Sequence, residues 1–327
     1  MTQDVATGFD GFVGQAEPFR RELLAHCYRM LGSLDDAEDV VQETYLRAWR
    51  SYDGFEGRSS LRVWLHRIAT NACLTAAEQR GRRPMPSGLG GPSDDPDGRP
   101  AEAPDLPWLH AVPDELVTPD SQDPAVVAAT RDSVRLALIA GLQELPARQR
   151  AVLLLREVLE IPATEVAVML DTSVPAVKSA LQRARARIAE VAPTPAGLVE
   201  PADPVARSLL DQYVAGFENA DLAVLERALR ADAAIEMVGS TTWFSGRDTC
   251  LRYLARVLGA PGDWRMVRTS ANGQPAAAAY LRGADGVRRA FGLGVLTATS
   301  TGISRIVVFA GGADLLARFG QPADLGV

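Results

Sequence analysis

The sequence predicts a multidomain protein in which two all-α domains precede a C-terminal α+β cone. Three observations predict this order. Apolar residues recur at helical spacing up to residue 83 and again over 130–192, whereas residues 84–129 are rich in Pro, Gly and acidic side chains. In the last third, short alternating segments are separated by turn pairs such as Asn272-Gly273. The second helical domain has the pattern of a helix-turn-helix.

The composition fits an ordinary globular protein and argues against several classes. The chain has 327 residues, of which 47% are hydrophobic, and a net charge of −7, so any nucleic-acid contact must come from locally focused basic residues. Its three cysteines have neither metal-ligand spacing nor a disulfide framework, so no metal or cofactor is expected. Without a secretion signal or a membrane-length apolar run, we expect a soluble cytoplasmic protein.

The first helical domain is expected over residues 10–83. Residues 18–31 carry one apolar face and stop at Gly32, and Ser33 then caps a helix with five acidic residues among positions 35–43. Acids in the first turns stabilise the helix dipole, which alone could explain them. Five acids in nine residues also repel one another, and this favours a basic protein partner for that surface.

A basic segment follows between residues 54 and 83. Phe55, Trp64 and His66 add rings near its arginines. This combination suits single-stranded nucleic acid, because bases stack on aromatic rings and phosphates pair with arginine. Core packing is the competing interpretation for Trp64, which lies on the apolar stripe. The arginines concerned are Arg58, Arg62, Arg67, Arg80, Arg82 and Arg83.

Residues 84–129 are expected to be an acidic linker. Arg99 is its one basic residue, and such a composition cannot bury enough apolar surface to fold alone. Pro stiffens the segment and like charge extends it, so a solvated spacer is one interpretation. The apolar Pro107-Trp108-Leu109 within it is nevertheless expected to dock, with the C-terminal domain as a candidate site.

The second helical domain is expected over residues 130–192. It contains two short helices around Asp171-Thr172-Ser173, where Asp tolerates a left-handed turn and Thr172 or Ser173 can cap the next helix. That helix has an apolar stripe on one side and, on the other, Lys178, Ser179, Gln182, Arg183 and Arg185. The arrangement predicts a helix-turn-helix whose second helix enters a DNA groove. A helical hairpin with a solvated basic face is the alternative.

The C-terminal domain is expected over residues 203–320, as three helices followed by a curved antiparallel sheet. All three histidines lie outside it, and Asp211, Asp232 and Glu236 have no partner at a catalytic spacing, so we do not expect an enzyme. The large apolar side chains are expected to line a core or a cavity that could hold a small ligand. They are Tyr213, Met237, Trp243, Trp264, Tyr280 and Phe291.

Three motifs together resemble the extracytoplasmic-function class of bacterial sigma factors. They are DAEDVVQETYLRAW (residues 36–49), WLHRIATNACL (64–74), and LQELPARQRAVLLLRE (142–157) followed by the helix-turn-helix. The resemblance implies a protein that binds core RNA polymerase, at its clamp and flap, and directs initiation at specific promoters. It makes residues 10–83 sigma region 2 and residues 130–192 sigma region 4.

The resemblance also assigns roles to individual residues. Docking on the polymerase clamp is implied for Asp36, Asp39, Val40, Gln42 and Glu43. Contact with the −10 promoter element is implied for the segment that holds Arg58, Arg62, Trp64, Arg67, Asn71, Arg80, Arg82 and Arg83. Contact with the −35 element is implied for the helix that holds Thr172, Ser173, Lys178, Ser179, Gln182, Arg183, Arg185 and Arg187. Residues 145–155 match the part that grips the flap, and the linker is expected to thread a basic polymerase channel.

The C-terminal pattern resembles, less specifically, SnoaL-like members of the NTF2 fold. This resemblance implies a domain that modulates the sigma factor. The alternative is a SnoaL-type enzyme or small-molecule sensor that uses the helical half as a tether to DNA or polymerase. A DNA-binding repressor that works without polymerase is a third hypothesis, which the acidic segment 35–43 disfavours because a repressor has no need of that surface. Asp171 and Ala180 depart from the family pattern, so the promoter sequence cannot be predicted.

Overall fold

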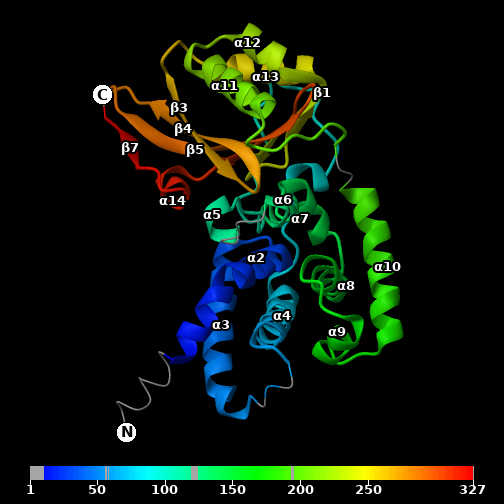
Figure 1. The fold of residues 1–327 in the computed structure, drawn as a ribbon. Helices are drawn as coiled ribbons and strands as arrows, with labels where there is room; N and C mark the ends of the chain where they lie inside the picture. Colours follow the sequence, from blue (N-terminus) through cyan, green and yellow to red (C-terminus); the bar gives the residue numbers. More distant parts are fainter. Residues whose placement is uncertain (1–10, 56, 58, 119–123, 193–194, 327) are drawn as a thin grey trace. The chain divides into compact units, whose positions relative to one another are not determined.

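The computed structural model describes residues 11–326, except 56, 58, 119–123 and 193–194 (Figure 1). The chain divides into two units. Residues 1–83 and 115–193 form a helical unit, and residues 84–114 and 194–327 form a cone unit. The expected linker is therefore divided between them. Among the described residues, no helix combines the length and the apolar character needed to cross a membrane.

The first three long helices of the helical unit pack against one another. They are α2 (Arg20–Leu31), α3 (Leu34–Ser51) and α4 (Leu61–Arg80), with the short η1 (Glu17–Phe19) and η2 (Tyr52–Gly54) beside them. Gly32 ends α2 in the left-handed conformation (φ 69°), and the Ser33 side chain accepts a hydrogen bond from the Asp36 N–H, as predicted. Ser60 caps α4 in the same way, through the N–H of Val63.

The remainder of the helical unit contains the helix-turn-helix. This part of the chain consists of α5 (Asp114–Val117), α6 (Pro124–Asp132), α7 (Leu136–Gln143), α8 (Ala147–Leu153), the π-helical turn η4 (Leu154–Val158), α9 (Ala163–Met169) and α10 (Val174–Val191), of which α9 and α10 form the helix-turn-helix. Asp171 has φ 48°, the left-handed conformation expected of it, between α9 and α10. Ser173 caps α10 by accepting from the N–H of Ala176. Val177 and Ala184 face inward from α10.

The cone unit has a seven-stranded sheet and three main helices. In sheet order the strands are β2 (Trp243–Ser245), β1 (Leu229–Val238), β6 (Gly302–Ala310), β5 (Arg288–Thr299), β4 (Gln274–Arg282) and β3 (Trp264–Ala271), and β7 (Asp324–Leu325) pairs with β5. The sheet is mixed, because β1 and β6 run parallel, whereas an antiparallel sheet was predicted. The helices are α11 (Pro204–Glu218), α12 (Leu222–Ala228), α13 (Arg247–Val257) and the short α14 (Gly312–Ala317).

Helices α11, α12 and α13 cover one face of this sheet (Figure 1). Tyr213 and Phe217 of α11 pack there with Trp264 of β3, and all three are less than 9% exposed. Gly294 of β5 makes room for this packing, because a Cβ at that position would lie 2.7 Å from the Tyr213 hydroxyl. Burial raises the pKa of Tyr213. The helix-covered face is therefore a filled apolar core.

Residues 84–114, here called the strap, also belong to the cone unit. Trp108 is 8% exposed and Leu109 is fully buried, so this apolar island is packed rather than solvated, and the nearby Ala103 N–H donates to the Gly239 carbonyl of the C-terminal domain at 2.8 Å. Val112 exchanges two hydrogen bonds of 3.0 Å with Asn272, one through the side chain and one through the backbone. The solvated-spacer interpretation is wrong for the strap, because strand edges and turns supply partners for its polar backbone.

Candidate nucleic-acid and polymerase interfaces

The acidic helix α3 presents one exposed face. Asp39, Gln42 and Glu43 are exposed on it. Glu43 pairs with Arg47 at 2.6 Å, but both side chains are half-exposed, so this ion pair contributes little stability. Asp36 is 9% exposed and forms an ion pair with Arg83. Val40 is 4% exposed and lies in the core of the helical unit, so its predicted contact with polymerase is corrected.

Leu46 extends this face and was missed by the sequence analysis. It lies one to two turns beyond Asp39, Gln42 and Glu43 on α3, and half of its surface is exposed. An exposed Leu beside three exposed polar residues is typical of a protein-binding surface. The signal was present in the sequence, because Leu46 follows Asp39 at a spacing of seven residues and falls outside the buried stripe.

Helix α4 places the predicted −10 residues in different environments. Arg67 and Asn71 are exposed, and Trp64 is half-buried with its ring centroid 4.8 Å from that of Phe55. The packing and nucleic-acid interpretations of Trp64 are thus compatible, since one part of the ring remains open. Arg80 ends the helix, and Arg58 lies outside the described residues.

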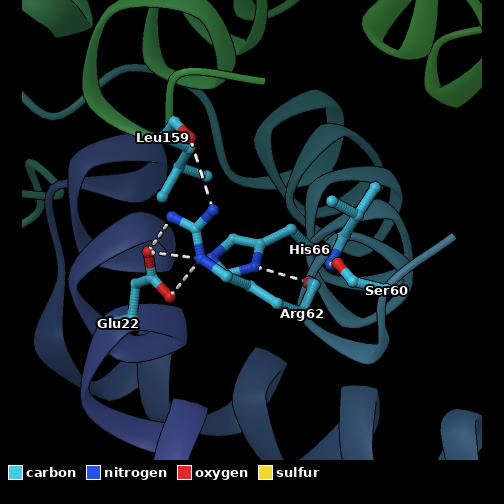
Figure 2. A network of polar contacts seen from close by, with 6 residues as sticks. Glu22, Ser60, Arg62, His66 and Leu159 are labelled. Atoms are coloured by element: carbon cyan, nitrogen blue, oxygen red, sulfur yellow. Dashed lines mark hydrogen bonds and ion pairs between the residues drawn. The ribbon is translucent and has the colours of Figure 1, made fainter. Parts of the chain in front are cut away.

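Three other arginines of the −10 set have internal partners. Arg82 donates to Glu144 at 2.9 Å, and Arg83 pairs with Asp36. Figure 2 shows Arg62 extended from α4 toward Glu22 of α2, with the Leu159 carbonyl on its far side. Its Nε lies 3.0 and 2.9 Å from the two Glu22 carboxylate oxygens, and its Nη1 lies 3.4 Å from the Leu159 oxygen.

The pKa values of this network follow its geometry. Burial acts to raise the pKa of Glu22, but the hydrogen bond from Arg62 and the nearby His66 outweigh it, so the pKa lies below its ordinary value. The hydrogen bond to Glu22 raises the pKa of Arg62. His66 is fully buried, and its Nδ1 lies 2.8 Å from the Arg62 carbonyl oxygen. Burial lowers the pKa of His66 and, more strongly, that of His26.

Helix α10 keeps its predicted −35 face open. Thr172, Ser173, Lys178, Ser179, Gln182, Arg183 and Arg185 are exposed, and Arg187 is half-buried. Arg183 donates to the Ser179 hydroxyl at 2.6 Å, which orients its guanidinium along the helix. Arg185 pairs with Glu157, and Arg187 pairs with Glu190, at 2.6 and 3.0 Å between largely exposed groups. Water and DNA phosphates can replace such pairs at little cost.

The segment that matches the flap-gripping part lies largely inside the helical unit. Leu145 and Ala151–Leu155 are buried, and Arg150 is 5% exposed. Arg150 donates to the Met30 carbonyl at the end of α2, and to the Gln143 side chain at 2.8 Å. Burial lowers the pKa of Arg150 to about 10, so it stays cationic at neutral pH.

Five of the six large apolar side chains that were expected to line a core or a cavity lie in three different environments. Tyr213, Met237 and Trp264 belong to or pack against the helix-covered core. Trp243 lies on β2 and donates from its indole to the Gly90 carbonyl of the strap, at 2.9 Å. Tyr280 donates to the Pro322 carbonyl at 2.9 Å, beside the C-terminal strand. Tyr213, Met237 and Trp264 thus follow the core alternative, and ligand binding by the C-terminal domain stays a prediction.

Glu236, a candidate base, has a structural partner instead. It is fully buried on β1 and pairs with Arg305 of β6, which faces the same way because Ala234 and Arg305 are in register. Ile235 and Ile306 point to the helix-covered side, so the ion pair lies on the opposite face. The N–H of Ser87 in the strap donates to the Glu236 carboxylate at 2.9 Å. Burial lowers the pKa of Arg305.

Known proteins similar to this chain agree with these features. Residues 16–83 match the Sigma-70 region 2 family, and residues 135–188 match the Sigma-70, region 4 family. The ECF RNA polymerase sigma factor SigG of Mycobacterium tuberculosis is 50% identical over 317 residues, covering 96% of this chain and 85% of SigG. SigJ, an ECF RNA polymerase sigma factor of the same species, is 28% identical over 223 residues, covering 67% of this chain and 62% of SigJ.

The crystal structure of SigJ has the same overall fold. It aligns with a TM-score of 0.59 at 21% identity, covering 94% of this chain and 98% of SigJ. The two helical modules and their order therefore define a sigma-70-type initiation factor. This chain belongs to the extracytoplasmic-function sigma factors, and it carries a C-terminal α+β cone after the two sigma regions. As a sigma factor it directs transcription initiation.

Proposed function

We propose that this sigma factor docks on the clamp of core RNA polymerase through the exposed face of α3. The observation that carries the proposal is the joint exposure of Asp39, Gln42, Glu43 and Leu46 on one side of that helix. Acidic side chains around an exposed Leu complement a basic surface with an apolar centre. Exposed residues on α4 and α10 then contact the −10 and −35 promoter elements.

The cone unit, in this proposal, modulates initiation by holding the strap. The strap carries six acidic residues and one arginine, which suits it to a basic polymerase channel in the way that the family resemblance implies. While the strap is hydrogen-bonded to the cone, that channel cannot receive it. A modest difference in affinity between the two sites shifts the population that is competent for initiation. The whole cycle belongs in the cytoplasm, where the polymerase works.

The cone has no catalytic role in this proposal. Two observations support this assignment. Glu236 is committed to Arg305 and to the strap, and the helix-covered face is filled with apolar side chains. A general base needs access to a substrate proton, which a carboxylate in that setting lacks.

A charge-reversal experiment tests the polymerase contact. Asp39→Lys/Glu43→Lys should lower the affinity for core polymerase at least tenfold, because like charges then face the basic clamp, and runoff transcription should fall with it. Glu226→Lys/Asp314→Lys, which reverses two exposed acids of the cone unit, is the matched control. Affinity is measured by fluorescence anisotropy at two salt concentrations. Unchanged affinity in the α3 variant, with its helicity intact, rules out this face as the docking surface.

A further inference from the structure

Regions 2 and 4 pack directly against each other in the helical unit through buried arginines. Arg29 of α2 is 2% exposed and donates to the carbonyl and hydroxyl of Ser133, in the segment that leads into region 4. Arg150 of α8 donates to the Met30 carbonyl of α2. Gln143 of α7 lies between these two arginines and contacts both, through the Arg29 carbonyl and the Arg150 guanidinium.

Arg62 adds a third contact that involves a predicted DNA-binding residue. Its guanidinium spans the Glu22 carboxylate and the Leu159 carbonyl, so one side chain joins α2, α4 and the turn before α9 (Figure 2). We call Glu22, Arg62 and Leu159 the clasp. The fork of donors on a guanidinium matches a carboxylate and a phosphate equally well. Glu22 therefore presents Arg62 with the same chemistry as a DNA backbone.

This packing is incompatible with contacting both promoter elements at once. The −10 and −35 elements lie about 25 base pairs apart, which is more than two helical turns of about 34–36 Å each. Two small domains in side-by-side contact cannot span that distance. Region 4 must therefore leave region 2 before the −10 and −35 elements are bound together.

We propose that the helical unit rests in a closed state in which Glu22 occupies Arg62 in place of a DNA phosphate and the Leu159 carbonyl ties the same arginine to region 4. Opening the interface then releases a −10 residue and separates the two DNA-binding modules in a single step. This inference rests on the proposed function and on the family resemblance, which includes Arg62 in the set of −10 contacts.

The chemistry of the interface favours reversible opening. Its arginines contact carbonyl, hydroxyl and carboxylate oxygens, and water or phosphate supplies the same acceptors once the domains part. The Glu22 and Arg62 side chains retain 29% and 35% of their exposure, so a DNA phosphate can approach and compete for Arg62.

Glu22→Gln in the full chain tests the clasp. It keeps the shape of the side chain and removes the charge that holds Arg62. Fluorescent labels at Glu78→Cys and Ala189→Cys, both on exposed helix positions, report the distance between regions 2 and 4 by energy transfer. The native Cys27, Cys73 and Cys250 are fully buried and escape labelling of the folded chain. Asp285→Asn, which breaks a comparable exposed pair with Arg289 in the cone, is the matched control.

Two readouts separate the possible results. If the closed state exists, Glu22→Gln should increase several-fold the population of molecules whose two labels are far apart, relative to the labelled chain that keeps Glu22. Without polymerase, the same variant should bind a single-stranded −10 oligonucleotide with several-fold higher affinity. The swap Glu22→Arg/Arg62→Glu should restore the short label distance by re-forming the pair, which excludes misfolding as the cause. Unchanged label distances in Glu22→Gln overturn the closed-state inference. Longer distances without tighter oligonucleotide binding overturn instead the assignment of Arg62 to the −10 element.

Discussion

Individual charged residues in this chain have partners of their own before any polymerase or promoter is present. Asp36 pairs with Arg83, and Arg62 pairs with Glu22. The family resemblance assigns Asp36 to the polymerase contact and both arginines to the −10 contact. Sequence patterns identify which residue types stand at a position, but an ion pair between positions 47 residues apart depends on the fold. Their exposure keeps Asp39, Gln42 and Glu43 as candidates for the polymerase contact, whereas Val40 lies on the buried face of α3, as its helical phase indicates.

The buried histidines make stability depend on pH. His26 and His66 stack edge to face at 5.5 Å between ring centroids, and burial holds both pKa values below 6.5 in the folded chain. Unfolding restores ordinary pKa values, so between pH 7.5 and 5.5 the unfolded chain takes up protons that the folded chain does not. The free energy of unfolding should therefore fall with pH, by up to about 1.4 kcal/mol for each histidine at pH 5.5.

Urea unfolding followed by helical circular dichroism at pH 5.5, 6.5 and 7.5 measures this dependence. Glu22 does not interfere, because its lowered pKa places its titration below this range. The pair His26→Gln/His66→Gln serves as the control, since the slope with pH should then flatten whatever the absolute stability. A wild-type chain whose unfolding free energy stays constant across these three pH values contradicts the buried-neutral assignment.

At the scale of elements, local signals predicted most of the fold and long-range pairing accounts for what was missed. Gly32, Asp171 and the turn at Asn272-Gly273 each have the positive φ that their residue type favours, and the helices and strands beside them were predicted. The parallel pairing of β1 with β6, and the short β2 and α14, were missed. Those features depend on contacts between distant segments, which periodicity within one window cannot reveal.

Helix α10 illustrates what exposure alone leaves open. Lys178 and Arg183 are both exposed on its outer face, and either could contact a base edge or a phosphate. Lys178→Ala or Arg183→Ala should weaken binding of the polymerase complex to a cognate promoter by about 1–3 kcal/mol if the lost contact is to a base. Fluorescence anisotropy on promoters that vary across the −35 element measures the loss for each sequence.

The pattern of loss across those promoters decides the role of each residue. A base contact gives a loss that depends on the base at one position. A phosphate contact gives a uniform loss and a shallower dependence on salt. If both substitutions leave affinity unchanged for every promoter, the exposed face of α10 does not read the −35 element.

At the scale of the whole molecule, the proposed function gives the strap a regulatory role that depends on how firmly the cone holds it. Different hydrogen bonds hold the two ends of the strap on the cone. The Ser87 N–H contacts the buried Glu236 carboxylate at one end, and at the other Asn272 pairs with Val112 while the Gly273 N–H donates to Asp114 at 2.7 Å. Weakening one end should release part of an acidic segment that the polymerase channel can then bind.

Asn272→Gly weakens the Val112 end with little strain. Glycine accepts the left-handed φ of 55° at this turn, whereas the side-chain oxygen that receives the Val112 N–H is lost. Loss of one buried hydrogen bond of about 1–2 kcal/mol should speed hydrogen exchange of residues 109–114 roughly five- to thirtyfold. Runoff transcription at limiting sigma concentration should rise in parallel, because more chains have the strap free.

Thr301→Gly in the β5–β6 turn is the control, since that turn lies apart from the strap contacts described here. Hydrogen exchange reports whether the strap is released from the cone, and transcription reports whether that release increases initiation. Unchanged exchange at 109–114 means that Asn272 does not hold the strap. Faster exchange with unchanged transcription means that strap release does not limit initiation, and that the cone acts on the sigma factor by some other contact.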